Sequence, residues 1–172
     1  MLHDYYTAEG KYVEHLTGAT TDPCILARNN NNLLTKSFTL NNPLKNKYSN
    51  GNNMKEYTLY TFEPSIVVNK IEFDITSSYS YEDTSNVPDN TYYYVLLRYN
   101  NNDHNLTKKL YCNESTTTTY NATRRTFTYE FKNMKTSNYD VSLILQLFST
   151  KPSATAIINA YNIKIYYYGN TD

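Results

Sequence analysis

The chain is poor in the residues that build most catalytic and ligand-binding motifs. Its 172 residues include no tryptophan, only four glycines, two cysteines and three histidines. Four glycines leave little material for the loops that hold phosphates or nucleophilic serines, and no such motif is present. The histidines, His3, His15 and His104, form no HxxxH or HExxH pattern of the kind that binds zinc. We therefore expect a protein that is not an enzyme and that has no catalytic metal or cofactor.

An excess of charge of either sign is also lacking. Sixteen Lys and Arg residues balance sixteen Asp and Glu residues, so the formal net charge is zero. Binding to nucleic acid by phosphate neutralisation, or to an anionic membrane surface, needs a basic excess. No apolar run reaches the 18 residues of a transmembrane helix, and the first residues lack the basic start and apolar core of a signal peptide. The sequence predicts no nucleic-acid partner, no membrane partner and no secretion signal.

The two cysteines, Cys24 and Cys112, lie far apart and form no CxxC pair. Two interpretations stay open. They are unpaired thiols, as is usual in a protein that folds in the cytosol, or they form a disulfide that ties the N-terminal segment to the rest of the chain.

What the chain does contain is 24 asparagines, 23 threonines and 20 tyrosines. Asn and Thr are poor helix formers, whereas Thr and Tyr suit a pleated, half-buried surface. The composition therefore favours β structure. Because AT-rich codons encode Asn and Tyr, genome composition is a second source of this bias.

The first 54 residues differ from the rest. They carry asparagine-rich turn formers between short apolar pieces, with one short strand expected at 35–40. We interpret 1–54 as an extended arm or a loosely structured extension, and 55–172 as the folded domain. An alternative for the start of the chain is a short helix over 5–16, which Gly10 weakens.

From residue 56 onward, segments of alternating or continuous apolar residues are separated by turn formers. The asparagine run at 100–103 predicts a turn, and the Thr-rich segment 115–120 is either an edge strand or a loop. Strands are expected at 56–62, 66–76, 92–99, 106–112, 127–131, 141–148, 154–158 and 163–167. About eight or nine strands without helical periodicity predict an all-β fold, an antiparallel β-sandwich.

Several of these strands resemble those of carbohydrate-binding modules and galactose-binding-like domains, which are jelly rolls. The residues that carry the resemblance are the segments 71–75, 92–99, 127–131, 141–148 and 162–166. It implies a jelly-roll β-sandwich and a glycan as ligand. The tryptophan that usually stacks on sugars is missing, and tyrosine would have to take that role.

Composition and layout also resemble structural proteins of tailed bacteriophages with AT-rich genomes, which are often Asn-, Thr- and Tyr-rich β-sandwiches with an N-terminal arm. This resemblance implies a component of the capsid, head fibre, neck or tail, made in the host cytoplasm and located in the virion. Its partners would be other virion proteins and further copies of itself, as a homo-oligomer.

The tyrosines are the main candidates for a contact surface. Each buried hydroxyl needs a hydrogen-bond partner, so some of the 20 tyrosines must lie at the surface, where they give a large contact area at low entropic cost. Codon bias with ordinary sheet-surface packing is the alternative. The residues we expect in such a surface are Tyr92, Tyr94, Tyr111, Tyr166 and Tyr168.

Three further features are polar. Arg98 and Gln146 fall inside otherwise apolar strands, so they line a groove or lie on a solvated sheet face. The acidic residues Glu82, Asp83 and Asp89 are either a solvated loop or ligands of a structural calcium ion, which prefers oxygen donors.

Overall fold

The fold was analysed in a computed structural model. It describes residues 33–48, 53–81, 91–112, 122–136, 141–150 and 154–169, together with the backbone at 5–6 and 12–13. Every regular element in these ranges is a β-strand. No helix in them has the length and apolar character needed to cross a bilayer.

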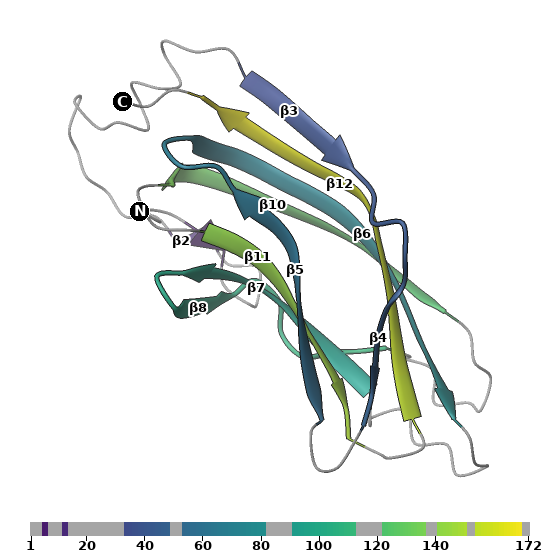
Figure 1. Cartoon of the computed structure of the whole chain (residues 1–172). Helices are drawn as coiled ribbons and strands as arrows, with labels where there is room; N and C mark the ends of the chain where they lie inside the picture. The colour runs from purple at the N-terminus through teal and green to yellow at the C-terminus, as the bar shows by residue number, and fades with distance from the viewer. Residues whose placement is uncertain are drawn as a thin grey trace.

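The strands form two five-stranded antiparallel sheets that pack face to face (Figure 1). Sheet 1 consists of β3 (Leu33–Phe38), β4 (Leu44–Lys47), β6 (Val67–Tyr81), β10 (Thr123–Lys135) and β12 (Ala154–Tyr168). Sheet 2 consists of β5 (Met54–Phe62), β7 (Thr91–Tyr99), β8 (Asn102–Asn105), β9 (Leu110–Tyr111) and β11 (Val141–Ser149). The expected all-β sandwich is confirmed.

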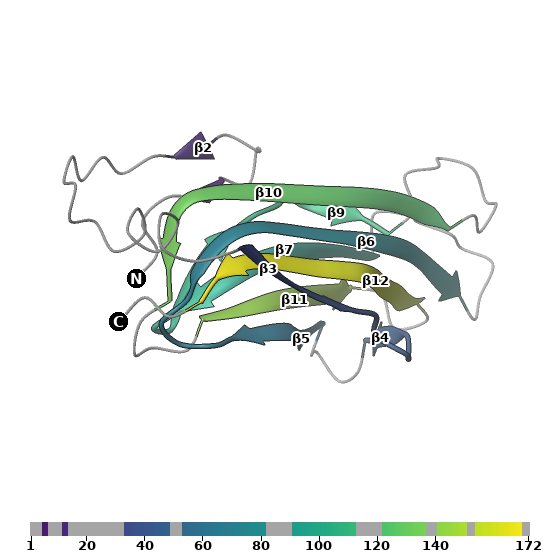
Figure 2. The same ribbon diagram turned by 90° about the horizontal axis from the view of Figure 1, so that it is seen from above.

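The strand order identifies the topology. Sheet 1 runs β10-β6-β12-β3, with β4 also pairing to β12, and sheet 2 runs β5-β11-β7-β8, with β9 also pairing to β7. From β4 to β12 the chain changes sheet at every connection except those from β7 to β8 and from β8 to β9, and β3 and β4 lie in the same sheet. Because β3 and β4 share one side of β12, and β8 and β9 share one side of β7, each sheet has four strand positions. This interleaving of two four-position layers is the order of a jelly roll. Figure 2 shows the two layers from above.

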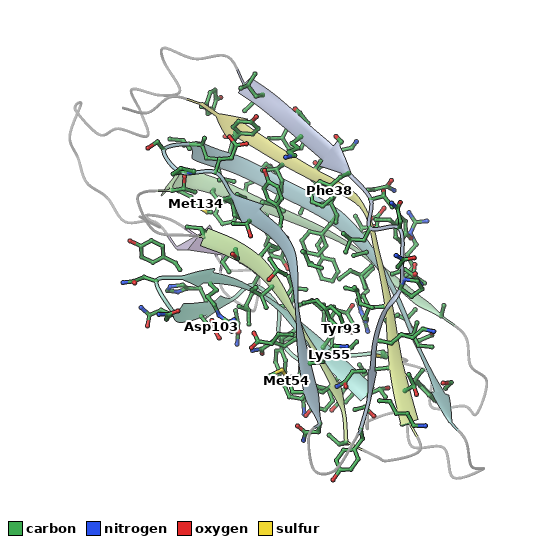
Figure 3. All side chains as sticks on the ribbon, viewed as in Figure 1. Phe38, Met54, Lys55, Tyr93, Asp103 and Met134 are labelled. Atoms are coloured by element: carbon green, nitrogen blue, oxygen red, sulfur yellow. The ribbon has the colours of Figure 1, made fainter. Side chains whose placement is uncertain are left out.

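The core is the space between the sheets, which side chains from both layers fill (Figure 3). Alternation puts every second residue of the central strands inward, as expected for the face shared by Ile71, Phe73 and Ile75. Fully buried residues from the other central strands are Tyr93, Val95, Leu97, Leu143, Leu145, Leu147, Ile163 and Ile165. Two long strands in each layer thus carry most of the apolar burial that stabilises the fold.

Three asparagines have the positive φ values that glycine adopts most easily. Asn100 and Asn101 have φ values of 48° and 62°, and they join Tyr99 to Asn102 in a two-residue hairpin. Positive φ at both central residues is what the favoured hairpin turn requires, and Asn tolerates it better than other residues with a side chain. The predicted turn at 100–103 is thus confined to its first two residues, because β8 begins at Asn102.

A third asparagine, Asn162, has a φ of 51° and lies in a bulge of β12. Tyr161 and Lys164 pair with Asp74 and Glu72, so two residues of β12 face only one residue of β6. The bulge shifts the alternation. The sequence therefore suggested two strands, at 154–158 and 163–167, where the structure has one.

One other strand prediction needs correction. The segment 106–112 is not one strand, because only Leu110 and Tyr111 pair, while the backbone N–H groups of Leu106 and Thr107 donate to the carbonyl of Val95 at 2.9 and 3.2 Å. Segment 115–120 lies outside the described residues.

Part of the predicted arm, 1–54, belongs to the sandwich. Strands β3 and β4 both pair with β12 and complete one edge of sheet 1. The sequence of β4, Leu-Lys-Asn-Lys, has one apolar residue and so gives no strand signal. The arm interpretation therefore narrows to 1–32. Within that segment the helix alternative over 5–16 is wrong, since β1 (Tyr5–Tyr6) and β2 (Tyr12–Val13) pair as antiparallel strands and β1 runs beside β10.

Candidate contact surface

Tyrosines gather on the outer face of sheet 2. Because Tyr93 and Val95 point into the core, their neighbours Tyr92 and Tyr94 point outward. Phe148 on β11 and Tyr111 on β9 both lie opposite Tyr92, one on each side of β7. We call the surface formed by Tyr92, Tyr94, Tyr111 and Phe148 the tyrosine face. It brings together three of the five predicted contact tyrosines.

The rings of the tyrosine face pack on one another. Tyr92 and Phe148 are stacked, with centroids 4.7 Å apart and an interplanar angle of 13°. Tyr94 meets the rings of Tyr92 and Phe148 edge-on at 6.1 and 5.9 Å, and Tyr111 meets Tyr92 at 6.3 Å. Stacked and edge-to-face pairs are the preferred arrangements of aromatic rings. The cluster is thus held in place on a paired sheet before any partner arrives.

A lysine extends this surface. The Nζ atom of Lys109 lies 4.3 Å from the centroid of the Tyr92 ring and 5.8 Å from that of Tyr111, within the range of cation–π attraction. Tyr111 is 37% exposed, one of three large hydrophobic residues so exposed in the described ranges. Phe148 on β11 and Lys109, which directly precedes β9, both lie against the Tyr92 ring, so Tyr111 offers the most accessible ring.

The other two predicted tyrosines lie elsewhere. Tyr166 is on the outer face of sheet 1, where its hydroxyl lies 3.3 Å from Glu72 Oε2 and Lys70 Nζ lies 4.5 Å from its ring centroid. Tyr168, near the end of β12, packs against Val67. The tyrosines of β12 are therefore not part of the tyrosine face.

Arg98 and Gln146 share the outer face of sheet 2 with the tyrosine face. The Arg98 guanidinium binds Glu56 at 2.6 Å and Asp103 at 2.7 Å, so it joins β5, β7 and β8. The hydrogen bonds that Arg98 donates, to Asp103 first and then to Glu56, raise the pKa of Arg98, and the bond to Asp103 lowers the pKa of that carboxyl. Gln146 lies between Glu56 and Tyr94 in the register and is half-buried. Arg98 holds strands together here.

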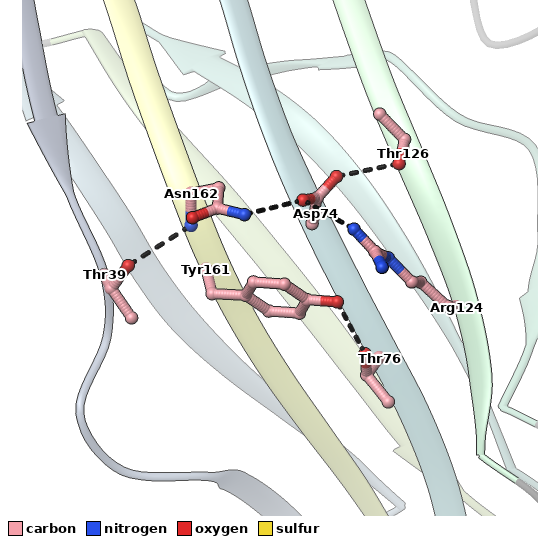
Figure 4. A network of polar contacts seen from close by, with 7 residues as sticks. All are labelled: Thr39, Asp74, Thr76, Arg124, Thr126, Tyr161 and Asn162. Atoms are coloured by element: carbon pink, nitrogen blue, oxygen red, sulfur yellow. Dashed lines mark hydrogen bonds and ion pairs between the residues drawn. The ribbon is translucent and has the colours of Figure 1, made fainter.

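Sequence reasoning missed a polar network on the outer face of sheet 1 (Figure 4). Asp74 on β6 accepts hydrogen bonds from Thr126 Oγ1 at 2.8 Å, from Asn162 Nδ2 at 3.0 Å and from Arg124 at 3.4 Å. Asn162 also donates its backbone N–H to Thr39 Oγ1 at 3.2 Å. The bonds of Asn162, Thr126 and Arg124 hold the pKa of Asp74 below its usual range.

The Asp74 network joins β6, β10 and β12 to the end of β3. Beside it the hydroxyls of Tyr161 and Thr76 are 3.1 Å apart. The side chain of Asp74 is 11% exposed although it lies on an outer face. Only the bulge at Asn162 brings that amide to the carboxylate, so spacing along the sequence gave no signal for this site.

A second polar group lies inside the sandwich, next to Cys112. Arg125 donates to the hydroxyl of buried Tyr93 at 3.0 Å, and Ser77 donates to the carbonyl of Cys112 at 2.8 Å. Burial raises the pKa of Tyr93 to about 12 and that of the Cys112 thiol to about 12. Cys112 is a free thiol. A buried thiol with a raised pKa is unreactive. The residues around Cys112 therefore have a structural role in the core. Cys24 lies outside the described residues.

The predicted calcium ligands Glu82, Asp83 and Asp89, like His3 and His15, lie outside the described residues. His104 is half-buried on β8. Within the described ranges, no three His, Cys, Asp or Glu side chains are grouped so that they could hold a metal ion.

Strand order and outer faces together define the class of this protein as a jelly-roll β-sandwich with an aromatic face on one sheet. No protein-family model matches the chain, and no curated protein is similar to it. Among solved structures, it is similar to a chain in the structure of infectious bursal disease virus, Gx strain, with 7% identity and a TM-score of 0.26. That match covers 79% of this chain and 38% of the viral one. At so low a TM-score it carries no argument about fold or function.

Proposed function

We propose that this protein is a non-enzymatic structural component of a virus particle that acts through protein–protein contacts. The observation that carries the proposal is the tyrosine face, a preformed aromatic surface on a rigid sheet. Aromatic residues are enriched in the cores of protein interfaces, where they bury a large area with few rotatable bonds. The jelly roll supports the proposal, because capsid domains share this architecture.

The fold alone does not select this function, since lectin domains and cupins are jelly rolls too. Two features favour a particle component. The chain has a net charge of zero and is rich in Asn, Thr and Tyr, which suits a neutral surface that packs against proteins. Residues 1–32 precede the sandwich, and we propose that they act as an arm that docks on a neighbouring protein. The finer proposal is a capsid, head-fibre, neck or tail component of a tailed bacteriophage.

Mass spectrometry of purified particles tests this function. Particles produced from the genome that encodes the chain should contain it at a fixed stoichiometry after gradient purification. The variant Tyr111→Ala should lower its incorporation at least several-fold, because it removes the most exposed ring of the tyrosine face. Ser78→Ala, on the outer face of sheet 1, is the matched control and should incorporate normally. A chain that is abundant in the lysate but missing from particles would contradict the proposal.

A second candidate function is carbohydrate binding, favoured by the exposed ring of Tyr111 beside Lys109. A sugar stacks on a free ring face, whereas Phe148 stacks on the Tyr92 ring and Lys109 Nζ lies over it. Tyr111 would therefore be the main stacking platform. A glycan array probed with the wild-type chain and with Tyr111→Ala decides this. Binding that Tyr111→Ala abolishes supports the lectin function, and signals at background for the wild type exclude the sugars on the array.

A further inference from the structure

The edges of the two sheets are protected in different ways, with one exception. Sheet edges present unpaired backbone groups that can pair with another chain, and natural proteins usually block them. In sheet 2, one edge is broken into the short strands β8 and β9, and the other edge, β5, carries a bulge near Leu59. In sheet 1, β10 runs beside β1. On β4 the hydroxyl of Tyr57 bonds both the N–H and the carbonyl of Lys45.

Strand β3 is the exception. In the described part of the chain it pairs on one side only, with β12, and no side chain caps its outward backbone. Five of its six residues are exposed. Leu33 and Leu34 are 44% and 46% exposed, and with Tyr111 they are the large hydrophobic residues that the described surface exposes. The edge with free backbone groups is thus also the edge with exposed leucines.

Charged side chains, above all lysines and including those that point inward, are among the devices that block a sheet edge. The lysine of β3 is Lys36, and its Nζ lies 5.4 Å from the centroid of the Tyr60 ring on the neighbouring sheet, within the range of cation–π attraction. Lys36 pairs with Ile165 of the core, whereas Leu33, Thr35 and Ser37 pair with the outward residues of β12. The only charge of β3 is therefore held over its own sandwich.

The sequence of β3 is also compatible with antiparallel pairing to β3 of a second copy. When two copies join edge to edge around a two-fold axis, residues that face each other must lie on the same face of the extended sheet, so the axis passes through one residue pair. An axis at Thr35 places Thr35 opposite Thr35, Leu33 opposite Ser37 and Leu34 opposite Lys36. No like charges meet, and Thr–Thr is a favourable cross-strand pair. An axis at Lys36 would set two lysines directly against each other.

We propose that β3 is a self-association edge, where a second copy of this chain pairs antiparallel with Thr35 on the two-fold axis. The paired edge is short compared with the roughly 20–30 residues per side of a standard interface. The dimer is therefore reversible and forms at high protein concentration, as within an assembly. This inference does not depend on the tyrosine face, which lies on the other sheet.

Sedimentation equilibrium of the full chain is the first test. The apparent mass should rise from 20.1 kDa toward twice that value with concentration. Leu34→Lys places a lysine opposite Lys36 of the second copy and should weaken the dimer at least tenfold. Thr58→Lys is the control, a lysine added at an exposed residue of β5 on sheet 2 outside the tyrosine face, and should leave the dimer unchanged. A wild-type chain that stays monomeric, or a dimer that Leu34→Lys and Thr58→Lys weaken equally, overturns the proposal.

Cysteine cross-linking tests the register in a Cys24→Ser background. Cysteines at 35 in the two copies would have Cα atoms about 4.5–5.5 Å apart, which a disulfide can span. At Ser37 the two cysteines would lie about 13 Å apart along the strands. Under mild oxidation Thr35→Cys should give a disulfide-linked dimer in non-reducing electrophoresis, and Ser37→Cys should not. Equal cross-linking of the two variants, or none in either, contradicts an axis at Thr35.

Discussion

The outer face of sheet 1 carries a polar network, whereas the outer face of sheet 2 carries a cluster of aromatic rings. On sheet 1, Asp74 is almost shielded from water and accepts three hydrogen bonds from two neighbouring strands. On sheet 2, aromatic rings stack on one another and leave Tyr111 open to solvent. The polar side chains on sheet 1 bind neighbouring strands of the same sheet. The aromatic side chains on sheet 2 include an exposed ring that can contact a partner.

The difference has a physical cause. A carboxylate that loses water needs donors to replace it, and once all are present the group stabilises the strands that supply them. Removing water from an aromatic ring costs little free energy. A cluster of rings can therefore be ordered in the free protein and still bind a partner. We therefore expect substitutions on sheet 1 to affect folding and those on the tyrosine face to affect contacts.

The largest effect should come from Asp74→Ala. It leaves Asn162, Thr126 and Arg124 without their shared acceptor, and hydrogen bonds to a charged group contribute about 1.5–3 kcal/mol. We expect the free energy of unfolding, measured by urea titration, to fall by about 2 kcal/mol. The control is Ser78→Ala on the same face, which should change it by less than about 0.5 kcal/mol. An equal fall in the free energy of unfolding for Asp74→Ala and Ser78→Ala would show that the hydrogen bonds of Asp74 do not stabilise the fold.

Acid should act through the same carboxylate. The pKa of Asp74 in the folded protein lies below the unfolded value of about 3.9, so its contribution is complete above that value and is lost as the pH falls through the folded pKa. Urea midpoints measured from neutral pH down to about pH 3 should therefore fall less steeply for Asp74→Asn than for the wild type. Parallel curves would contradict the assignment. Because neutral donors from Asn162 and Thr126 cause most of the shift, added salt should change this acid limb little.

The smallest effect should come from Arg98→Gln, which breaks the ion pairs beside the tyrosine face. Its side chain is 32% exposed, and exposed ion pairs contribute about 0.2–1 kcal/mol. A double-mutant cycle with Glu56→Gln should give a coupling energy in this range that shrinks in high salt. A coupling as large as the Asp74→Ala effect would erase the contrast between the two faces.

The strands that sequence predicted well are those whose apolar residues alternate without interruption, such as β11 and the middle of β6. The misses occur where geometry departs from alternation. The bulge at Asn162 made β12 resemble two strands, and the edge strands β3 and β4 have too few apolar residues to reveal their pairing with β12. Tyr92, Tyr94 and Tyr111 were predicted to share a surface, but the stacking role of Phe148 and the whole Asp74 network were not.

By itself the sequence determined that the chain forms strands, because Thr, Tyr and alternating apolar residues favour a sheet with one buried face. It also supplied residues other than glycine for the hairpin turn and the bulge of the backbone, since asparagine adopts positive φ at residues 100, 101 and 162. Only the tertiary structure decided which residues meet. Sheet order separates Tyr166 from the tyrosine face, and a single bulge carries Asn162 to Asp74. Contacts between strands far apart in the chain depend on register and sheet order, and local sequence pattern encodes neither.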